Sequence, residues 1–214
     1  MKKQIYKIVA VAFATAAIAG GIVLYQLQCV KAQTFSIQKI GIIDDCLNTL
    51  PTDNTVIYNS DQFKSKDSHG QELLKYLSLR GYTGKIYYYM AEDENGNISS
   101  NAIVNGLNWM LENGIKDVNI SLSSQRESEE LKNWISEHKE IQIFSSYNNQ
   151  DNSSDYPSMY EDVIASGASS NIAYKETDRK YITNRILLWN HGIHYFSGNS
   201  FLSLETLLRE KVEK

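Results

Sequence analysis

The sequence predicts an α/β fold: a three-layer sandwich in which helices cover both faces of a mostly parallel central sheet. Short apolar segments rich in β-branched and aromatic residues alternate along the chain with amphipathic segments of helical period. Such alternation builds βαβ units, whose strands pair in parallel. The length of 214 residues, of which 42% are hydrophobic and 21% charged, accommodates one domain and a short appendage.

Eight segments are predicted to be strands because apolar residues dominate them and polar or glycine-containing turns bound them. The first ends at Asp44 after an apolar run that is typical of a buried parallel strand. In chain order the predicted strands are residues 37–44, 55–58, 85–90, 117–122, 141–145, 163–167, 185–189 and 193–196.

Four segments have apolar residues at helical spacing. In the first, leucines recur on one face and Gly81 follows as a natural C-cap. A serine precedes the second, where it can accept a hydrogen bond from the first turn. The predicted helices are residues 69–80, a segment from Ser99 or Ser100 to Gly114, residues 127–138, and a last helix that begins near Ser200.

The N-terminus is predicted to be a membrane or export segment. Lys2, Lys3 and Lys7 precede residues 8–25, which carry no charge. The length of this run is near the minimum for a helix that spans a membrane, which needs about 20 residues. It is also long for the apolar core of a signal peptide. Small or short residues also precede a possible cleavage site after Ala32. A signal anchor and a cleaved signal peptide are therefore both open.

These observations predict two parts of the chain. Residues 1–32 form the signal anchor or signal peptide, and residues 33–214 form the exported domain. The basic flank is expected to stay in the cytoplasm. The chain is then a single-pass protein of the cell membrane with an extracellular C-terminal domain, or a secreted protein if it is cleaved after Ala32.

Composition excludes several classes of function. The net charge of −4 and the absence of a basic patch argue against nucleic acid as a partner. Two cysteines, Cys29 and Cys46, are too few for a disulfide scaffold and wrongly spaced for zinc, although one bridge between them stays open outside the cell. His191 and His194 lack a carboxylate cluster beside them. We therefore predict no metal and no cofactor.

Three short segments carry residues for nucleophilic catalysis. Asp44 ends a predicted strand, His69 opens a predicted helix, and Ser200 follows a glycine at the start of another helix. A serine hydroxyl becomes a nucleophile beside a base, and the base needs an orienting carboxylate. Sites of parallel sheets lie beyond the carboxyl ends of the strands, where Asp44 is expected. The order Asp, His, Ser is one of three known chain orders of a serine-protease triad.

The chain resembles the subtilisin-like serine proteases, which have this order of triad residues. The resemblance covers roughly residues 37–208 and rests on six segments that follow the family's order. They are Ile42-Ile43-Asp44, Ser68-His69-Gly70, residues 118–123 around Asn119-Ile120-Ser121-Leu122, Ser146-Tyr147-Asn148, residues 162–168 and Gly198-Asn199-Ser200 with the three residues that follow.

The resemblance implies a subtilisin-like central sheet and a serine endopeptidase that cleaves peptide bonds of a peptide or protein substrate without a cofactor. Asp44 would hold His69 in the correct tautomer, and His69 would take the proton from Ser200. The family's oxyanion-hole asparagine corresponds to Asn148.

The substrate backbone is expected to pair with the segment that resembles the family's Asn-x-Ser-Leu-Gly motif. The residues of this segment that would bind substrate are Ser121, Leu122 and Ser123.

The chain also departs from the family pattern, and the departures leave low activity open. Asp45-Cys46 stands where the family has threonine or serine followed by glycine, Tyr147 replaces a glycine, and Leu204 replaces a proline. Asp45 is expected to face solvent. One alternative function is a non-catalytic relative that binds extended peptides by strand addition. A second is a structural domain at the membrane surface.

Overall fold

A computed structural model of the chain describes residues 28–32, 34–51, 53–58, 67–149, 155–167, 174–175, 181–182, 185–190 and 192–210. The apolar run at residues 8–25, on which the membrane prediction depends, lies outside the described residues. Within the described ranges, no helix is long and apolar enough to cross a membrane.

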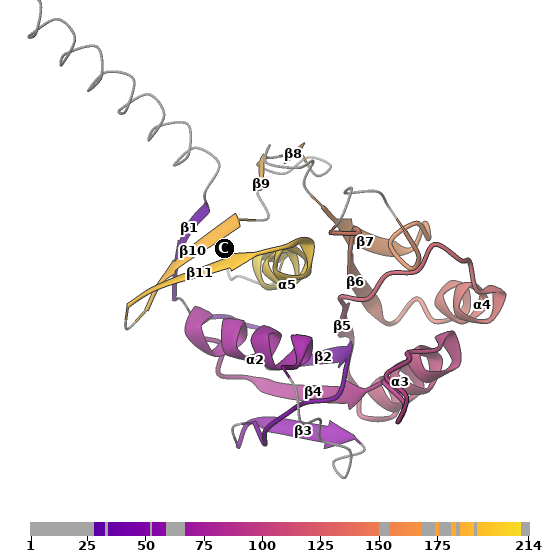
Figure 1. Ribbon diagram of the computed structural model, residues 1–214. Helices are drawn as coiled ribbons and strands as arrows, with labels where there is room; N and C mark the ends of the chain where they lie inside the picture. Colours follow the sequence, from indigo (N-terminus) through magenta and orange to yellow (C-terminus); the bar gives the residue numbers. More distant parts are fainter. Residues whose placement is uncertain are drawn as a thin grey trace, which may run out of the picture.

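A six-stranded parallel sheet forms the centre of the described structure (Figure 1). Its strands lie in the order β3-β4-β2-β5-β6-β7, and every neighbouring pair is parallel. The strand order reverses at β2, so the carboxyl end of β2 is the point where a ligand site is expected. The strands are β2 (Lys39–Asp44), β3 (Thr55–Tyr58), β4 (Lys85–Met90), β5 (Asp117–Ile120), β6 (Gln142–Ser146) and β7 (Val163–Ser166).

Two pairs of helices cover the two faces of this sheet. One apolar cluster joins α2 (His69–Arg80) and α5 (Asn199–Glu210) to one face. A second cluster joins α3 (Ser100–Glu112) and α4 (Glu129–Glu137) to the other face. The three-layer α/β prediction is therefore confirmed.

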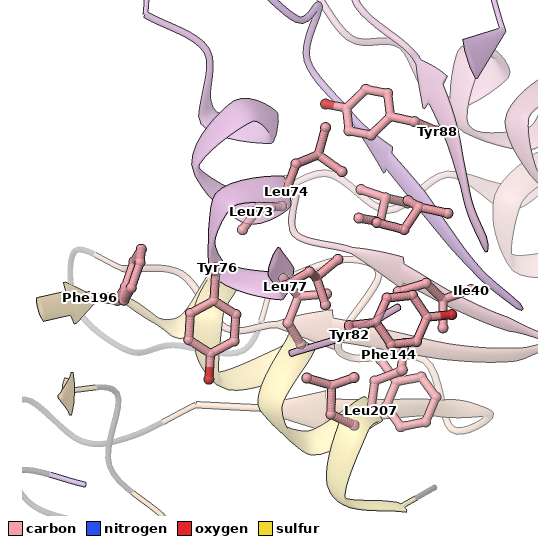
Figure 2. Packing of buried hydrophobic residues seen from close by; sticks show 14 of the residues in the cluster. Ile40, Leu73, Leu74, Tyr76, Leu77, Tyr82, Tyr88, Phe144, Phe196 and Leu207 are labelled. Atoms are coloured by element: carbon pink, nitrogen blue, oxygen red, sulfur yellow. The ribbon is translucent and has the colours of Figure 1, made fainter. Parts of the chain in front are cut away.

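The first cluster fixes the two helices that carry the candidate site. Figure 2 shows Leu77 of α2 and Leu207 of α5 in one cluster with Ile40 and Phe144 of the sheet. All four side chains are fully buried. Burying side chains of this size contributes about 1.5–3 kcal/mol each, so the positions of α2 and α5 relative to the sheet are set by packing.

Ser99 and Gly81 cap their helices as predicted, and Ser68 caps α2 without having been predicted. Ser68 accepts a hydrogen bond from Gln71 N at 3.1 Å, and Ser99 accepts one from Ala102 N at 3.1 Å. Gly81 ends α2 with φ of 85°, a conformation that glycine adopts without strain. Element boundaries differ from the predictions by one or two residues, as at β5, which ends at Ile120.

A smaller sheet lies beside α5. It contains β1 (Gln28–Lys31), β10 (Arg185–Trp189) and β11 (Ile193–Ser197), with β1 parallel and β11 antiparallel to β10. The strands β8 (Tyr174–Lys175) and β9 (Tyr181–Ile182) form a separate two-stranded antiparallel sheet.

The strand β1 was not predicted, and it belongs to the folded unit although it precedes the predicted boundary at residue 33. Its pairing with β10 identifies it as a strand.

Candidate active site

Asp44 and His69 meet at the carboxyl end of β2. The His69 Nδ1 and Asp44 Oδ1 atoms are 2.9 Å apart, and Asp44 Oδ1 also accepts a hydrogen bond from Asp45 N at 2.8 Å. Asp44 is fully buried, and its Oδ2 has no hydrogen-bond partner among the described residues. The structure thus brings these two predicted residues into the carboxylate–imidazole contact that orients a catalytic base.

The surroundings of His69 favour its charged form. Burial alone would lower the pKa of the His69 imidazole, but the hydrogen bond and charge of Asp44, together with the charge of Asp45, raise that pKa above its ordinary value. The His69 side chain is 39% exposed. Because Nδ1 faces Asp44, the other ring nitrogen, Nε2, is left for a proton donor or acceptor on the open side.

Asp45 does not face solvent as expected. Its carboxylate accepts hydrogen bonds from Ser68 Oγ at 2.8 Å, His69 N at 2.9 Å and Gly70 N at 2.9 Å. The first N–H groups of a helix have no partner within the helix, and the helix dipole favours a negative charge there. Asp45 therefore caps α2, a tertiary role that its sequence position does not reveal.

Ser200 lies in the first turn of α5 and is 2% exposed. It follows Gly198, whose φ of 132° is accessible to glycine. Among the described residues, no hydrogen bond joins Ser200 to His69, although both lie at the starts of neighbouring helices. Catalytic hydrogen bonds are often long before substrate binds, so this geometry is compatible with a nucleophile.

A buried ionic cluster links the helix of His69 to the helix of Ser200. Arg80 on α2 donates from Nε and Nη2 to the two carboxylate oxygens of Glu205 on α5, at 2.9 and 3.0 Å. Tyr76 and Arg209 donate to the same carboxylate. Burial alone would raise the pKa of Glu205, but its hydrogen bonds with Arg80 and the charges of Arg80 and Arg209 lower it.

Ser121 lies beneath α5 rather than in an open cleft. Its hydroxyl accepts from Asn119 Nδ2 at 2.7 Å and donates to the Ser200 carbonyl at 3.4 Å. Ser203 completes this network by donating to Asn119 Oδ1 at 2.7 Å. The side chain of Ser121 therefore supports the turn that carries Ser200, and only its backbone remains for the predicted pairing with substrate.

Leu122 and Ser123 line an open cavity of about 260 Å³. Ile103, Leu131 and Tyr160 form part of its apolar wall. The cavity can enclose an apolar side chain next to the segment that was predicted to bind substrate.

The side chain of Asn149, and not that of Asn148, contacts the N-terminus of α5. Asn148 donates from Nδ2 to Asp155 Oδ2 at 3.0 Å. Asn149 accepts from the backbone N–H of Asn199 at 2.6 Å, and its Nδ2 donates to none of the described residues. The amide of Asn149 thus lies against Gly198 and Asn199, the two residues before Ser200, whereas the predicted Asn148 points its amide to Asp155.

Tyr147, which precedes the two asparagines, packs against the residue that follows β7. A Cβ atom on Gly167 would lie 2.2 Å from Tyr147 Cδ2, so the tyrosine ring packs directly on the glycine at the end of β7. Asn199 Nδ2 donates to the carbonyl oxygens of Tyr147 and Asn148, at 3.3 and 3.1 Å. Asn199 was not among the predicted site residues, although it lies within the predicted segment Gly198-Asn199-Ser200.

The described residues show no group of three or more His, Cys, Asp or Glu side chains that could hold a metal ion. Cys46 is buried and its thiol donates to the Glu92 carbonyl at 3.5 Å. His191, one of two histidines considered as ligands, lies outside the described residues.

Several solved proteases are similar to the chain in fold. The subtilisin-like protease Apa1 from the Antarctic psychrotroph Pseudoalteromonas sp. AS-11 is 16% identical, with a TM-score of 0.46 over 60% of this chain and 35% of Apa1. The prenylagaramide maturation protease PagA is 12% identical, with a TM-score of 0.52 over 77% of this chain and 70% of PagA. A lanthipeptide protease is 16% identical, with a TM-score of 0.52 over 79% of this chain and 72% of its own.

No protein-family model and no curated protein matches the sequence. At these identities the similarity to solved structures concerns the fold. We conclude that the chain has a divergent subtilisin-like fold.

Proposed function

We propose that the chain is an exported, membrane-tethered serine endopeptidase. The observation that carries the proposal is the Asp44–His69 contact at the point where the strand order reverses, with Ser200 at the start of the neighbouring helix. A carboxylate, an imidazole and a serine at adjoining element ends match the requirements of acyl transfer.

In the proposed reaction His69 accepts the proton of the Ser200 hydroxyl as Oγ attacks the substrate carbonyl. Asp44 holds His69 with Nδ1 protonated and stabilises the imidazolium that forms. His69 then gives this proton to the leaving amine, and a water molecule hydrolyses the acyl–serine ester by the same route. The backbone N–H of Ser200 and Nδ2 of Asn149 would donate to the oxyanion.

An extended peptide fits the proposed substrate. Residues 121–123 follow β5 and can pair with a peptide backbone by strand addition, and the cavity beside Leu122 would receive an apolar side chain. Two proteins of similar fold are named as a maturation protease for prenylagaramide and as a lanthipeptide protease. By analogy we propose that the substrate is a peptide or small protein outside the cytoplasm.

The proposed location follows from the charge-free run at residues 8–25 and the lysines before it. Because β1 pairs with β10, cleavage after Ala32 would remove a strand from the smaller sheet. This supports the signal anchor over a signal peptide cleaved at that position.

The non-catalytic alternative has its own support. Ser200 is 2% exposed and makes no hydrogen bond with His69 among the described residues. A domain that binds extended peptides without cutting them would use the same segment after β5.

Labelling with a fluorophosphonate, which reacts with activated serines, tests the proposal. The full chain should be labelled, Ser200→Ala should not be, and Ser136→Ala, at an exposed serine on α4, should be labelled like the wild type. Equal labelling of wild type and Ser200→Ala would reject Ser200 as the nucleophile. If folded wild-type protein is never labelled, the peptide-binding alternative replaces the enzyme.

A further inference from the structure

Two successive carboxylates, Asp44 at the end of β2 and Asp45 directly after it, contact different parts of His69. Asp44 contacts the imidazole ring, whereas Asp45 contacts the backbone at the start of α2. The function proposed above uses only the first of them. The second occupies a position at which the resembled family has an uncharged hydroxyl residue.

Both oxygens of the Asp45 carboxylate are engaged by residues 68–70. Oδ1 accepts from Ser68 Oγ at 2.8 Å and from Gly70 N at 2.9 Å, and Oδ2 accepts from His69 N at 2.9 Å. Three hydrogen bonds from consecutive residues to one carboxylate fix the position and direction of the first helical turn. Hydrogen bonds to a charged acceptor are stronger than those to a neutral one.

Tyr88 holds Asp45 from the sheet. The hydroxyl of this fully buried tyrosine on β4 donates to the Asp45 carbonyl at 2.8 Å. The same hydroxyl touches α2, because a Cβ atom on Gly70 would lie 1.6 Å from it. Only glycine permits this approach of the helix to the sheet, so Tyr88, Asp45 and Gly70 form one closely packed support beneath His69.

We propose that Asp45, held by Tyr88, is a positioning residue that fixes the backbone of His69 so that its ring stays in contact with Asp44. The inference uses the proposed role of His69 as the base, but the contact itself does not depend on catalysis. Asp45 acts through the first turn of α2 and touches no reacting atom. A serine or threonine hydroxyl could accept from fewer of the three donors, which gives a physical reason for a carboxylate here.

Charged groups around this support act on both His69 and Tyr88. Asp44 and Asp45 raise the pKa of His69 against the effect of burial. Burial, followed by the charges of Asp44, Asp45, Cys46 and Glu92, raises the pKa of Tyr88 well above its ordinary value, so its hydroxyl remains a donor. Removing the charge of Asp45 should therefore lower the pKa of His69 both directly and by loosening its contact with Asp44.

Proton NMR of the full chain, with labelled histidine, tests the proposal independently of activity. The His69 signals are assigned by their loss in His69→Gln, and two observables are followed with pH: the titration of the ring and the downfield signal of the Nδ1 proton bound to Asp44. In Asp45→Asn we expect a lower pKa of His69 and a weakened or exchange-broadened downfield signal. Asp45→Ser, with the hydroxyl of the resembled family, serves as a second variant if the asparagine variant does not fold.

Asp93→Asn is the matched control. Asp93 also accepts backbone hydrogen bonds, from Asn95 N at 2.9 Å and Asn97 N at 2.8 Å, but it does so in an exposed turn. It should leave both His69 observables unchanged. If the Asp45 variants lose thermal stability but keep the wild-type titration and downfield signal, Asp45 is only a helix cap and the proposal is overturned. If the His69 observables change as expected in a chain that no fluorophosphonate labels, the positioning role stands and the proposed enzyme fails.

Discussion

The two halves of the candidate site differ in how they are built. The Asp44–His69 half joins the last residue of a strand to the first residue of a helix. The Ser200 half joins a helix start to the loop that follows β6, whose position depends on contacts of Asn199 and Tyr147 with residues far along the chain. Regular elements set the position of the first half, and loop contacts set that of the second. The effect of a substitution on the second half is therefore harder to predict from sequence.

The largest expected effect concerns the first half. Asp44→Asn should lower kcat about 10⁴-fold, because an amide at this position favours the wrong tautomer of His69. The substitution keeps the shape of the side chain, so the circular dichroism spectrum and urea midpoint should stay near those of the wild type. Near-normal turnover of a folded Asp44→Asn chain would remove Asp44 from the mechanism.

The next effect concerns the loop of the second half. Asn149→Ala should lower kcat by about 100- to 1,000-fold with little change in KM, because the oxyanion forms only in the transition state. Asn148→Ala is the control and should have a much smaller effect, since its Nδ2 donates to Asp155. The reverse order of the two effects would show that the loop places Asn148 at the oxyanion.

A third prediction concerns the ionic cluster between the halves. Glu205→Gln should lower the free energy of unfolding by about 3–5 kcal/mol, because the guanidinium of Arg80, 2% exposed, loses its buried counter-charge. Glu72→Gln, which breaks the exposed pair with Lys75, should cost less than about 1 kcal/mol. Urea unfolding measures both, and equal small losses would show that the cluster does not hold α2 to α5.

The same cluster predicts an acid dependence of stability. Because the pKa of Glu205 is lowered in the folded protein, its contribution is present above the unfolded pKa and is lost as the pH falls through the folded pKa. Glu205→Gln should therefore reduce the dependence of the urea midpoint on acid pH. An unchanged acid profile would indicate that other carboxylates cause it.

The smallest effect has the opposite sign and belongs to His69. Its pKa is raised above 6.5 in the folded protein, so its stabilising contribution is present below 6.5 and is lost as the pH rises through the raised pKa. His69→Gln should flatten the decline of the urea midpoint over this range. Because the side chain is 39% exposed, solvent screening keeps the effect small. A steeper decline in the variant would contradict the direction of the shift.

Sequence patterns predicted the regular elements well because long apolar periods and caps are local properties. The leucines at helical spacing and Gly81 as the C-cap predicted α2. Three successive tyrosines within an apolar segment indicated β4. The strand β1 was missed because it is recognised by its pairing with β10, in which Gln28 pairs with Ile186, 158 residues later.

The candidate site likewise contains contacts that local patterns predict and contacts that only the tertiary structure reveals. The contact between Asp44 and His69 follows from element ends that parallel topology brings together. Asp45 was expected in solvent because nothing in the sequence placed residues 68–70 against it. The contact of Asn149 with Asn199 likewise joins residues 50 positions apart. Such tertiary contacts leave no periodic signal in the sequence.

The pH dependence of fluorophosphonate labelling, with the labelled peptide identified by mass spectrometry, tests the central claim most directly. We predict that Ser200 carries the label and that the labelling rate rises with pH through the raised pKa of His69, since only neutral imidazole accepts the proton. His69→Ala should abolish the labelling. A label on another serine, or a rate at Ser200 that is independent of both pH and His69, would contradict the account.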